Sequence, residues 1–211
     1  MIKEFTFGGK KVRLTAYADR IIRVHAGETL TESLFDRYNL LRKPDENVGA
    51  DIENGIAVDG LSVTFADGVV TFKTDRVTRT VDLATPETEA IKEYFNTELG
   101  GMRPSPKQII GEDAKRSYGT VDFQKNSKYF TVRGIEDERF YGLGAANTDR
   151  LVLNGKTYLQ RVVYQSNEMP VPFVMTKAGY GILCNSTWWH GVDVCAKNAD
   201  EIVWYLPDGD V

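Results

Sequence analysis

The chain has 211 residues, of which 42% are hydrophobic and 11% aromatic, enough apolar side chain for the core of one large domain. Its 26 basic and 30 acidic residues give a net charge of −4, which offers no electrostatic attraction for nucleic acid or an anionic membrane. The sequence shows neither the long apolar run of a membrane span nor the N-terminal pattern of a signal peptide. We therefore expect a cytoplasmic protein with no nucleic-acid or membrane partner.

The N-terminal third has the pattern of short strands joined by tight turns. Apolar and polar residues alternate over Lys11–Tyr17 and over Arg20–Ala26, the period of half-buried strands. Leu61–Ala66 and Val69–Thr74 flank Asp67-Gly68, a two-residue signature of a type I′ hairpin. These patterns predict two antiparallel strand pairs.

Three further segments are less regular. The polar stretch Arg37–Asn54 is predicted to be a loop. Pro86–Phe95 alone has helical spacing, with proline in its first turn and acidic residues where the helix dipole favours them. Met102–Asn126 is rich in loop-forming residues. At most one short helix is therefore expected.

Strand patterns return in the C-terminal half. They cover Tyr129–Gly134, Arg139–Leu143, Val171–Thr176, Tyr180–Cys184, Val192–Ala196 and Glu201–Leu206. Many short strands separated by turn residues predict an all-β fold, either an antiparallel sandwich or a barrel. Cys184 and Cys195 are predicted to be free, because a reducing compartment disfavours disulfides.

A search for catalytic groups finds none in this sequence. The densest acidic cluster, Glu136-Asp137-Glu138, precedes a strand, and consecutive residues of an extended chain point to alternate sides. We predict a solvated turn there. His25 and His190 are far apart and lack metal-ligand spacing. Gly142-Leu143-Gly144 lacks the third glycine of a dinucleotide fingerprint. No catalytic residue, metal or cofactor is predicted.

One segment has unusual chemistry. In Glu138–Gly144 an aromatic pair runs into two glycines, which is typical of a strand end where the backbone bends and another segment approaches closely. A short strand and turn are predicted over Asp149–Lys156, and a polar, aromatic loop over Tyr158–Met169. Thr176–Asn185 then has the pattern of a strand, a turn and a second strand.

This order of elements resembles the N-terminal domain of glycoside hydrolase family 31, the α-glucosidases and α-xylosidases. In that family a Tyr-Gly-Leu-Gly turn, here Tyr141–Gly144, precedes a loop, a proline–phenylalanine strand and a Gly-Tyr-Gly hairpin, here Gly179–Gly181. The resemblance is clear over Glu138–Asn185 and looser over Leu14–Val24 and Leu61–Lys73.

The resemblance implies one galactose-mutarotase-like β-supersandwich over residues 1–211, packed on a (β/α)₈ catalytic barrel. Such a barrel carries the aspartate nucleophile and acid/base, and the nucleophile motif is not in this chain. The chain ends near the point where the family passes from sandwich to barrel. We therefore expect the full-length protein to be an α-glycosidase of carbohydrate metabolism, and this chain alone to be inactive.

In the family, a loop of the sandwich reaches over the barrel mouth and helps to shape the sugar-binding subsites. The matching loop here is Tyr158–Met169, whose amides and guanidinium suit sugar hydroxyls and whose ring suits a sugar face. The predicted contacts to an α-linked oligosaccharide are Gln160, Arg161, Tyr164, Gln165 and Asn167. Packing on the barrel without touching the sugar is the other interpretation of this loop.

Two other functions are compatible with a sandwich of this kind. A free-standing carbohydrate-binding module would show an exposed aromatic face and would bind sugar by itself. At most one ring of Trp188-Trp189 could serve such a face, because neighbours on a strand point to opposite sides. An aldose epimerase would need a histidine and a glutamate that meet in a cleft. The identity of the sugar and the oligomeric state are left open.

Overall fold

The computed structural model describes residues 1–30, 32–45, 47–83, 128–145, 151–160, 169–185 and 190–206. The strands of the N-terminal half are β1 (Ile2–Phe7), β2 (Lys10–Ala18), β3 (Ile21–Gly27), β4 (Ala50–Ile52), β5 (Gly55–Val58), β6 (Leu61–Ala66), β7 (Val69–Lys73) and β8 (Thr78–Asp82). Those of the C-terminal half are β9 (Lys128–Arg133), β10 (Phe140–Ala145), β11 (Lys156–Gln160), β12 (Met169–Thr176), β13 (Gly181–Leu183), β14 (His190–Val194) and β15 (Glu201–Leu206). Within this part of the chain, the helix is α1 (Leu34–Arg37).

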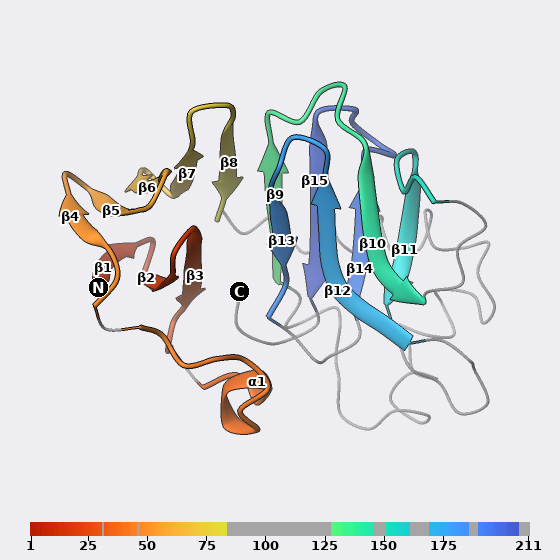
Figure 1. Cartoon of the computed structure of the whole chain (residues 1–211). Coiled ribbons are helices and arrows are strands. Elements are labelled where there is room, and N and C mark those ends of the chain that lie inside the picture. Colours follow the sequence, from red (N-terminus) through yellow and green to blue (C-terminus); the bar gives the residue numbers. More distant parts are fainter. Residues whose placement is uncertain are drawn as a thin grey trace.

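The described strands pair antiparallel and form a sandwich of two layers, which confirms the predicted fold class. One layer is a nine-stranded sheet in the order β11-β14-β15-β9-β8-β7-β6-β5-β4. The other layer consists of two three-stranded sheets, β1-β2-β3 and β10-β12-β13. In Figure 1 the second of these lies in front of β9, β15, β14 and β11. No helix among the described residues is long and apolar enough to cross a membrane.

Two hydrophobic cores lie between the layers, each formed by the nine-stranded sheet and one of the three-stranded sheets. Leu14 and Val63 belong to the N-terminal core, and Trp204 belongs to the C-terminal core, where its ring stacks on Phe130 at 5.1 Å between centroids. Val81, on β8, packs against both cores. The continuous sheet therefore joins the two halves through their apolar side chains.

The predicted hairpin at Asp67-Gly68 is confirmed. Ala66 pairs with Val69, and both turn residues have positive φ, 50° at Asp67 and 81° at Gly68, as a type I′ turn requires. Apart from the short strand predicted within Asp149–Lys156, the other predicted strands are found within a few residues of their expected bounds.

One expectation about the N-terminal half changes, and a short helix is present that was not predicted there. The predicted loop Arg37–Asn54 contains a strand, β4, which pairs with β5 at the edge of the sheet. This strand has only three residues, too few for its alternation to be recognised in the sequence. The helix of the structure, α1, begins after Ser33, whose Oγ accepts a hydrogen bond from the backbone N–H of Asp36 at 3.1 Å. The helix predicted over Pro86–Phe95 and the loop-rich Met102–Asn126 lie outside the described residues.

The predicted strand and loop around residue 155 were placed wrongly. Residues 151–155 are not a strand, and β11 begins at Lys156, so that Tyr158, Leu159 and Gln160 belong to a strand and not to a loop. Asn154 holds the turn: its Oδ1 accepts from Phe140 N at 2.8 Å, and its Nδ2 donates to Glu138 O at 2.7 Å. Polar residues occupy core-facing positions of β11, which hides its strand pattern.

Cys184 and Cys195 are free thiols, as predicted. Cys184 lies in the C-terminal core, and its burial raises the pKa of the thiol to about 12. Burial, followed by the nearby Asp193 and Asp200, raises the pKa of Cys195 to about 11. Both groups therefore stay protonated, and weakly nucleophilic, at neutral pH.

Candidate functional site at one end of the C-terminal half

Several strands begin or end together at one end of the C-terminal half. Ala145, the last residue of β10, pairs with Met169, the first residue of β12. Gln160, the last residue of β11, pairs with His190, the first residue of β14. This end lies at the lower right of Figure 1. We call it the rim, and the predicted substrate-binding residues follow Gln160 in the chain there.

Gln160 is the predicted site residue that the structure describes. Its side chain is 1% exposed and lies on the same face of β11 as the buried Tyr158. Within the described part of the chain, neither Nε2 nor Oε1 of Gln160 has a hydrogen-bond partner. Buried amides are almost always hydrogen-bonded, so this one has unused capacity for a hydroxyl or a water. The rim thus presents a polar group that the described protein does not satisfy.

Asn185, two residues after the end of β13, is a second buried amide of this kind. Both polar atoms of its side chain are buried and lack a hydrogen-bond partner in the described residues. Sequence reasoning placed Asn185 at the end of a hairpin but not among the binding residues. His190 is 3% exposed and lies at the start of β14.

The other predicted contacts, Arg161, Tyr164, Gln165 and Asn167, lie outside the described residues, as does Trp188-Trp189. Their role in substrate binding therefore stays a prediction. In the chain these residues follow Gln160, whose strand, β11, is paired with β14 over five residues.

The glycine motif holds β12 against β10 at the rim. Gly142, Leu143 and Gly144 have positive φ values of 131°, 62° and 67°, and the ladder shifts register between the two glycines. A Cβ on Gly142 would come 2.3 Å from Phe173 O, and one on Gly144 would come 2.3 Å from Met169 O. The predicted close approach of another segment is confirmed, and that segment is β12.

The acidic cluster before β10 is only partly a solvated turn. Glu136 and Asp137 are exposed, but the side chain of Glu138 is 10% exposed and pairs with Arg79 of β8. The hydroxyl of Tyr180 donates to Glu138 Oε2 at 2.8 Å and accepts from Arg79 Nε at 3.1 Å. The prediction was wrong for Glu138, because its partners come from distant parts of the sequence.

These contacts define the electrostatics of the three side chains, which we call the Glu138 cluster (Arg79, Glu138 and Tyr180). Burial is the main cause that raises the pKa of Tyr180, so its hydroxyl remains protonated and continues to donate to Glu138. The guanidinium of Arg79 also lies 5.4 Å from the centre of the Tyr180 ring. Both carboxylate oxygens of Glu138 are therefore engaged by protein groups.

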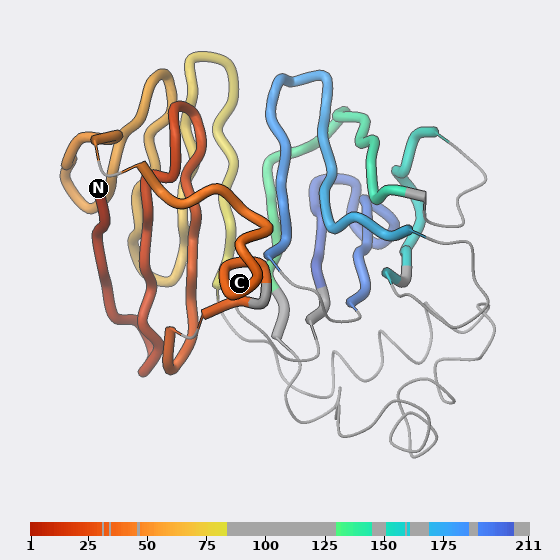
Figure 2. Tube along the Cα trace, turned by 60° about the horizontal axis from the view of Figure 1, so that its bottom comes forward, coloured from red at the N-terminus to blue at the C-terminus, as the bar shows by residue number. Residues whose placement is uncertain are grey.

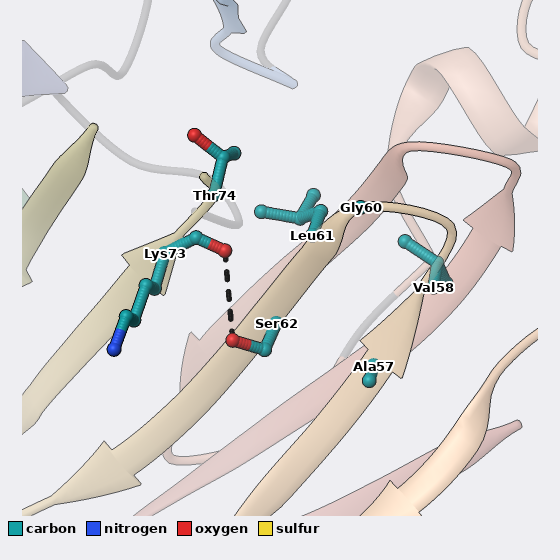
Figure 3. A pocket seen from close by; sticks show the side chains of 7 residues that line it. All are labelled: Ala57, Val58, Gly60, Leu61, Ser62, Lys73 and Thr74. Carbon is teal, nitrogen blue, oxygen red and sulfur yellow. Dashed lines mark hydrogen bonds between the residues drawn. The ribbon is translucent and has the colours of Figure 1, made fainter. Parts of the chain in front are cut away.

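A hollow of about 340 Å³ lies in the other half of the molecule, away from the rim (Figure 3). It is lined by Ala57, Val58, Gly60, Leu61, Ser62, Lys73 and Thr74. Lys73 is the charged residue of this lining, and it extends away from Leu61 in Figure 3. The lining contains neither a carboxylate nor a histidine, so it offers no acid–base pair.

Metal chemistry has no candidate in the part of the chain that the structure describes. There, no group of three or more His, Cys, Asp or Glu side chains lies close enough to hold a metal ion. The buried Asp193 is hydrogen-bonded within the protein, to Thr157 Oγ1 at 3.2 Å and to the backbone N–H of Ala196 at 2.8 Å.

Comparison with known proteins identifies relatives of this fold. Residues 11–193 match the model of the glycosyl hydrolase 31 N-terminal galactose mutarotase-like domain. A GH31 dextranase from Flavobacterium johnsoniae superposes with a TM-score of 0.59 at 14% identity, covering 100% of this chain and 24% of that one. A GH31 α-xylosidase from a soil metagenome superposes with a TM-score of 0.61 at 20% identity, covering 97% of this chain and 29% of that one. A GH31 α-xylosidase from Xanthomonas citri superposes with a TM-score of 0.54 at 17% identity, covering 90% of this chain and 19% of that one. The chain thus spans less than a third of each of these proteins.

Proposed function

Because the chain belongs to the glycosyl hydrolase 31 N-terminal galactose mutarotase-like domain family, we propose that it serves as the non-catalytic N-terminal sandwich of a retaining α-glycosidase. The enzyme would be an α-glucosidase or an α-xylosidase of carbohydrate metabolism. Its catalytic groups would lie in a (β/α)₈ barrel elsewhere in the full-length protein. The observation that carries this proposal is the match over residues 11–193, set beside solved relatives of which the chain covers only 24% and 29%.

Within such an enzyme, the sandwich packs on the catalytic domain and supplies residues 161–168 to the sugar site. The rim supports this role, because strands that are paired within the sandwich hold both ends of that segment, at Gln160 and Met169. The unsatisfied amide of Gln160 supports it too, since amides bind sugar hydroxyls. Arg161, Tyr164, Gln165 and Asn167 would complete the contacts to an α-linked oligosaccharide.

The proposal is tested by comparing the 211-residue chain with the full-length protein. We expect the full-length protein to hydrolyse p-nitrophenyl α-glucoside or α-xyloside, with a product that first appears as the α anomer by NMR, as retention requires. The isolated chain should hydrolyse neither. A full-length protein without activity on α-glycosides would show the proposal to be wrong.

Sugar binding distinguishes this proposal from a free-standing carbohydrate-binding module. Calorimetry of the isolated chain with maltose or isoprimeverose should show no binding, because most contacts to the sugar would come from the barrel. In the full-length enzyme, Arg161→Ala should raise KM roughly tenfold, the loss of one hydrogen bond from a charged group. Lys177→Ala, in the exposed turn after β12, is the matched control and should leave KM unchanged. Tight binding by the isolated chain would favour the module.

A further inference from the structure

Strand β12 is apolar on both of its faces. Val174 belongs to the C-terminal core and is 1% exposed. Met169, Val171 and Met175 occupy the alternate positions and are 71%, 46% and 49% exposed. A strand of a half-solvated sheet alternates apolar and polar residues, whereas a strand covered on both sides is apolar throughout. The sequence of β12 is therefore that of a covered strand, but one of its faces is open.

The neighbouring strands extend this open surface. Tyr141 on β10 pairs with Met175, and Leu183 on β13, 44% exposed, pairs with Phe173. A Cβ on Gly181 would come 2.6 Å from the Phe173 ring, so that ring lies flat against the sheet where glycine leaves room. We call the surface formed by six uncharged residues the outer face: Tyr141, Met169, Val171, Phe173, Met175 and Leu183.

The other three-stranded sheet shows how this protein covers an outer surface with its own chain. On the outer side of β1-β2-β3, Tyr17 is 8% and His25 is 5% exposed. The segment between β3 and β4 crosses that sheet in Figure 2, and Asp36 within it accepts a hydrogen bond from Arg23 Nη1 at 3.0 Å. Among the described residues, no helix or strand covers the outer face of β10-β12-β13 in the same way (Figure 1).

We propose that the outer face is the surface by which this sandwich docks on the catalytic domain of the full-length protein. This inference rests on the proposed function and names the contact surface that it requires. A contiguous exposed apolar surface without charge is typical of a permanent interface, and the two methionines can adapt to an irregular partner. The solved relatives, of which this domain makes up 24% and 29%, supply a large partner within the same chain.

The position of the outer face fits this partner. Met169, where β12 begins, belongs to the outer face and directly follows residues 161–168, which carry predicted sugar contacts. Met169 pairs with Ala145 at the rim, so the outer face and the rim are continuous along β12. A catalytic domain docked on this face would therefore lie next to the strand ends from which those contacts are supplied.

Hydroxyl-radical footprinting with mass spectrometry tests the inference. The full-length protein and the isolated chain are labelled under the same conditions, and the modification of single residues is compared. We expect Met169, Met175 and Leu183 to be modified several-fold more slowly in the full-length protein. Tyr38 and Leu40, which are 67% and 62% exposed on the other half, are the controls and should be modified equally in both.

Three results would overturn the inference. The outer face could react equally in both proteins, or protection could fall on Tyr38 and Leu40 instead. Protection in the isolated chain that grows with protein concentration, and is no greater in the full-length protein, would identify a second copy as the occupant. Each of these results leaves the proposed function standing if the full-length protein hydrolyses α-glycosides. Absence of that hydrolysis would contradict the proposed function whatever the footprint.

A pair of variants gives an independent readout. Met175→Lys should leave the unfolding midpoint of the isolated chain unchanged, because its side chain is exposed there. In the full-length enzyme it should separate the melting of this domain from that of the catalytic domain in calorimetry. Leu40→Lys is the control and should leave both the midpoint of the isolated chain and the melting profile of the full-length enzyme unchanged. An unchanged full-length melting profile for Met175→Lys would contradict docking through this face.

Discussion

The carboxylate of Glu138 has a protein partner on each of its two oxygens. It meets Arg79, 59 residues earlier in the chain, and Tyr180, 42 residues later. Because the three come from β8, from the turn before β10 and from the turn before β13, the cluster ties both layers of the sandwich together. A buried charge that loses its partner is costly, because the other ion stays desolvated.

We expect Glu138→Gln to lower the free energy of unfolding by about 3 kcal/mol, the usual cost of breaking a buried ion pair. Glu4→Gln is the matched control. Its carboxylate pairs with Arg13 at 2.7 Å, but the two side chains are 51% and 38% exposed, so its loss should be below about 1 kcal/mol. Urea denaturation of both variants provides the measurement. Equal losses would mean that the Glu138 cluster contributes no more than a surface pair.

At the scale of elements, the strand pair β10 and β12 depends on a bulge that only glycine allows. Gly144 has a φ of 67°, and a side chain there would meet the backbone of β12. Gly60, in the turn between β5 and β6, has a φ of 68° but nothing within 4 Å of its added Cβ. The two glycines therefore share the same backbone strain and differ only in the space beside them.

This comparison separates strain from steric clash. Gly60→Ala should cost about 1 kcal/mol, the penalty for a left-handed alanine. Gly144→Ala should cost about 3 kcal/mol, because overpacking against β12 is added to the same penalty. The free energies of unfolding, measured in urea, would show this difference. If the free energy of unfolding fell by the same amount in both variants, the predicted clash with β12 would be contradicted, because β12 would then move away from residue 144 without cost.

At the scale of the whole molecule, two cores share one sheet. Val81 contacts both cores and pairs with Val132 of β9, so the ladder continues without a break between the two halves. Cores that share a continuous sheet are expected to unfold together in one cooperative transition.

Leu14→Ala tests this cooperativity. Leu14 is fully buried in the N-terminal core, so its truncation should cost about 3 kcal/mol. All three tryptophans of the chain lie in the C-terminal half, and fluorescence therefore reports on the other core. We expect Leu14→Ala to lower the denaturation midpoint equally by fluorescence and by circular dichroism. Ile2→Ala, at a 59% exposed position, is the control and should shift neither. A lower circular dichroism midpoint with unchanged fluorescence would mean that the halves unfold separately.

The sequence by itself determined the features that depend on neighbours in the chain. The type I′ turn at Asp67-Gly68 was predictable, because two adjacent residues supply both positive φ values. The close approach at Gly142 and Gly144 was predictable as well, since glycines so placed leave room for another backbone. The resemblance over Glu138–Asn185 identified the family, which the match over residues 11–193 confirms.

Only the tertiary structure decided what depends on partners far away in sequence. Gln160 was expected in a loop, but pairing with His190, 30 residues later, makes it the buried end of a strand with an unsatisfied amide. Glu138 was expected in solvent, and two distant side chains bury it. The apolar sequence of β12 indicates a strand, but only the arrangement of the layers shows which of its faces is open. Burial arises from packing between elements, and a local pattern specifies the elements without specifying what covers them.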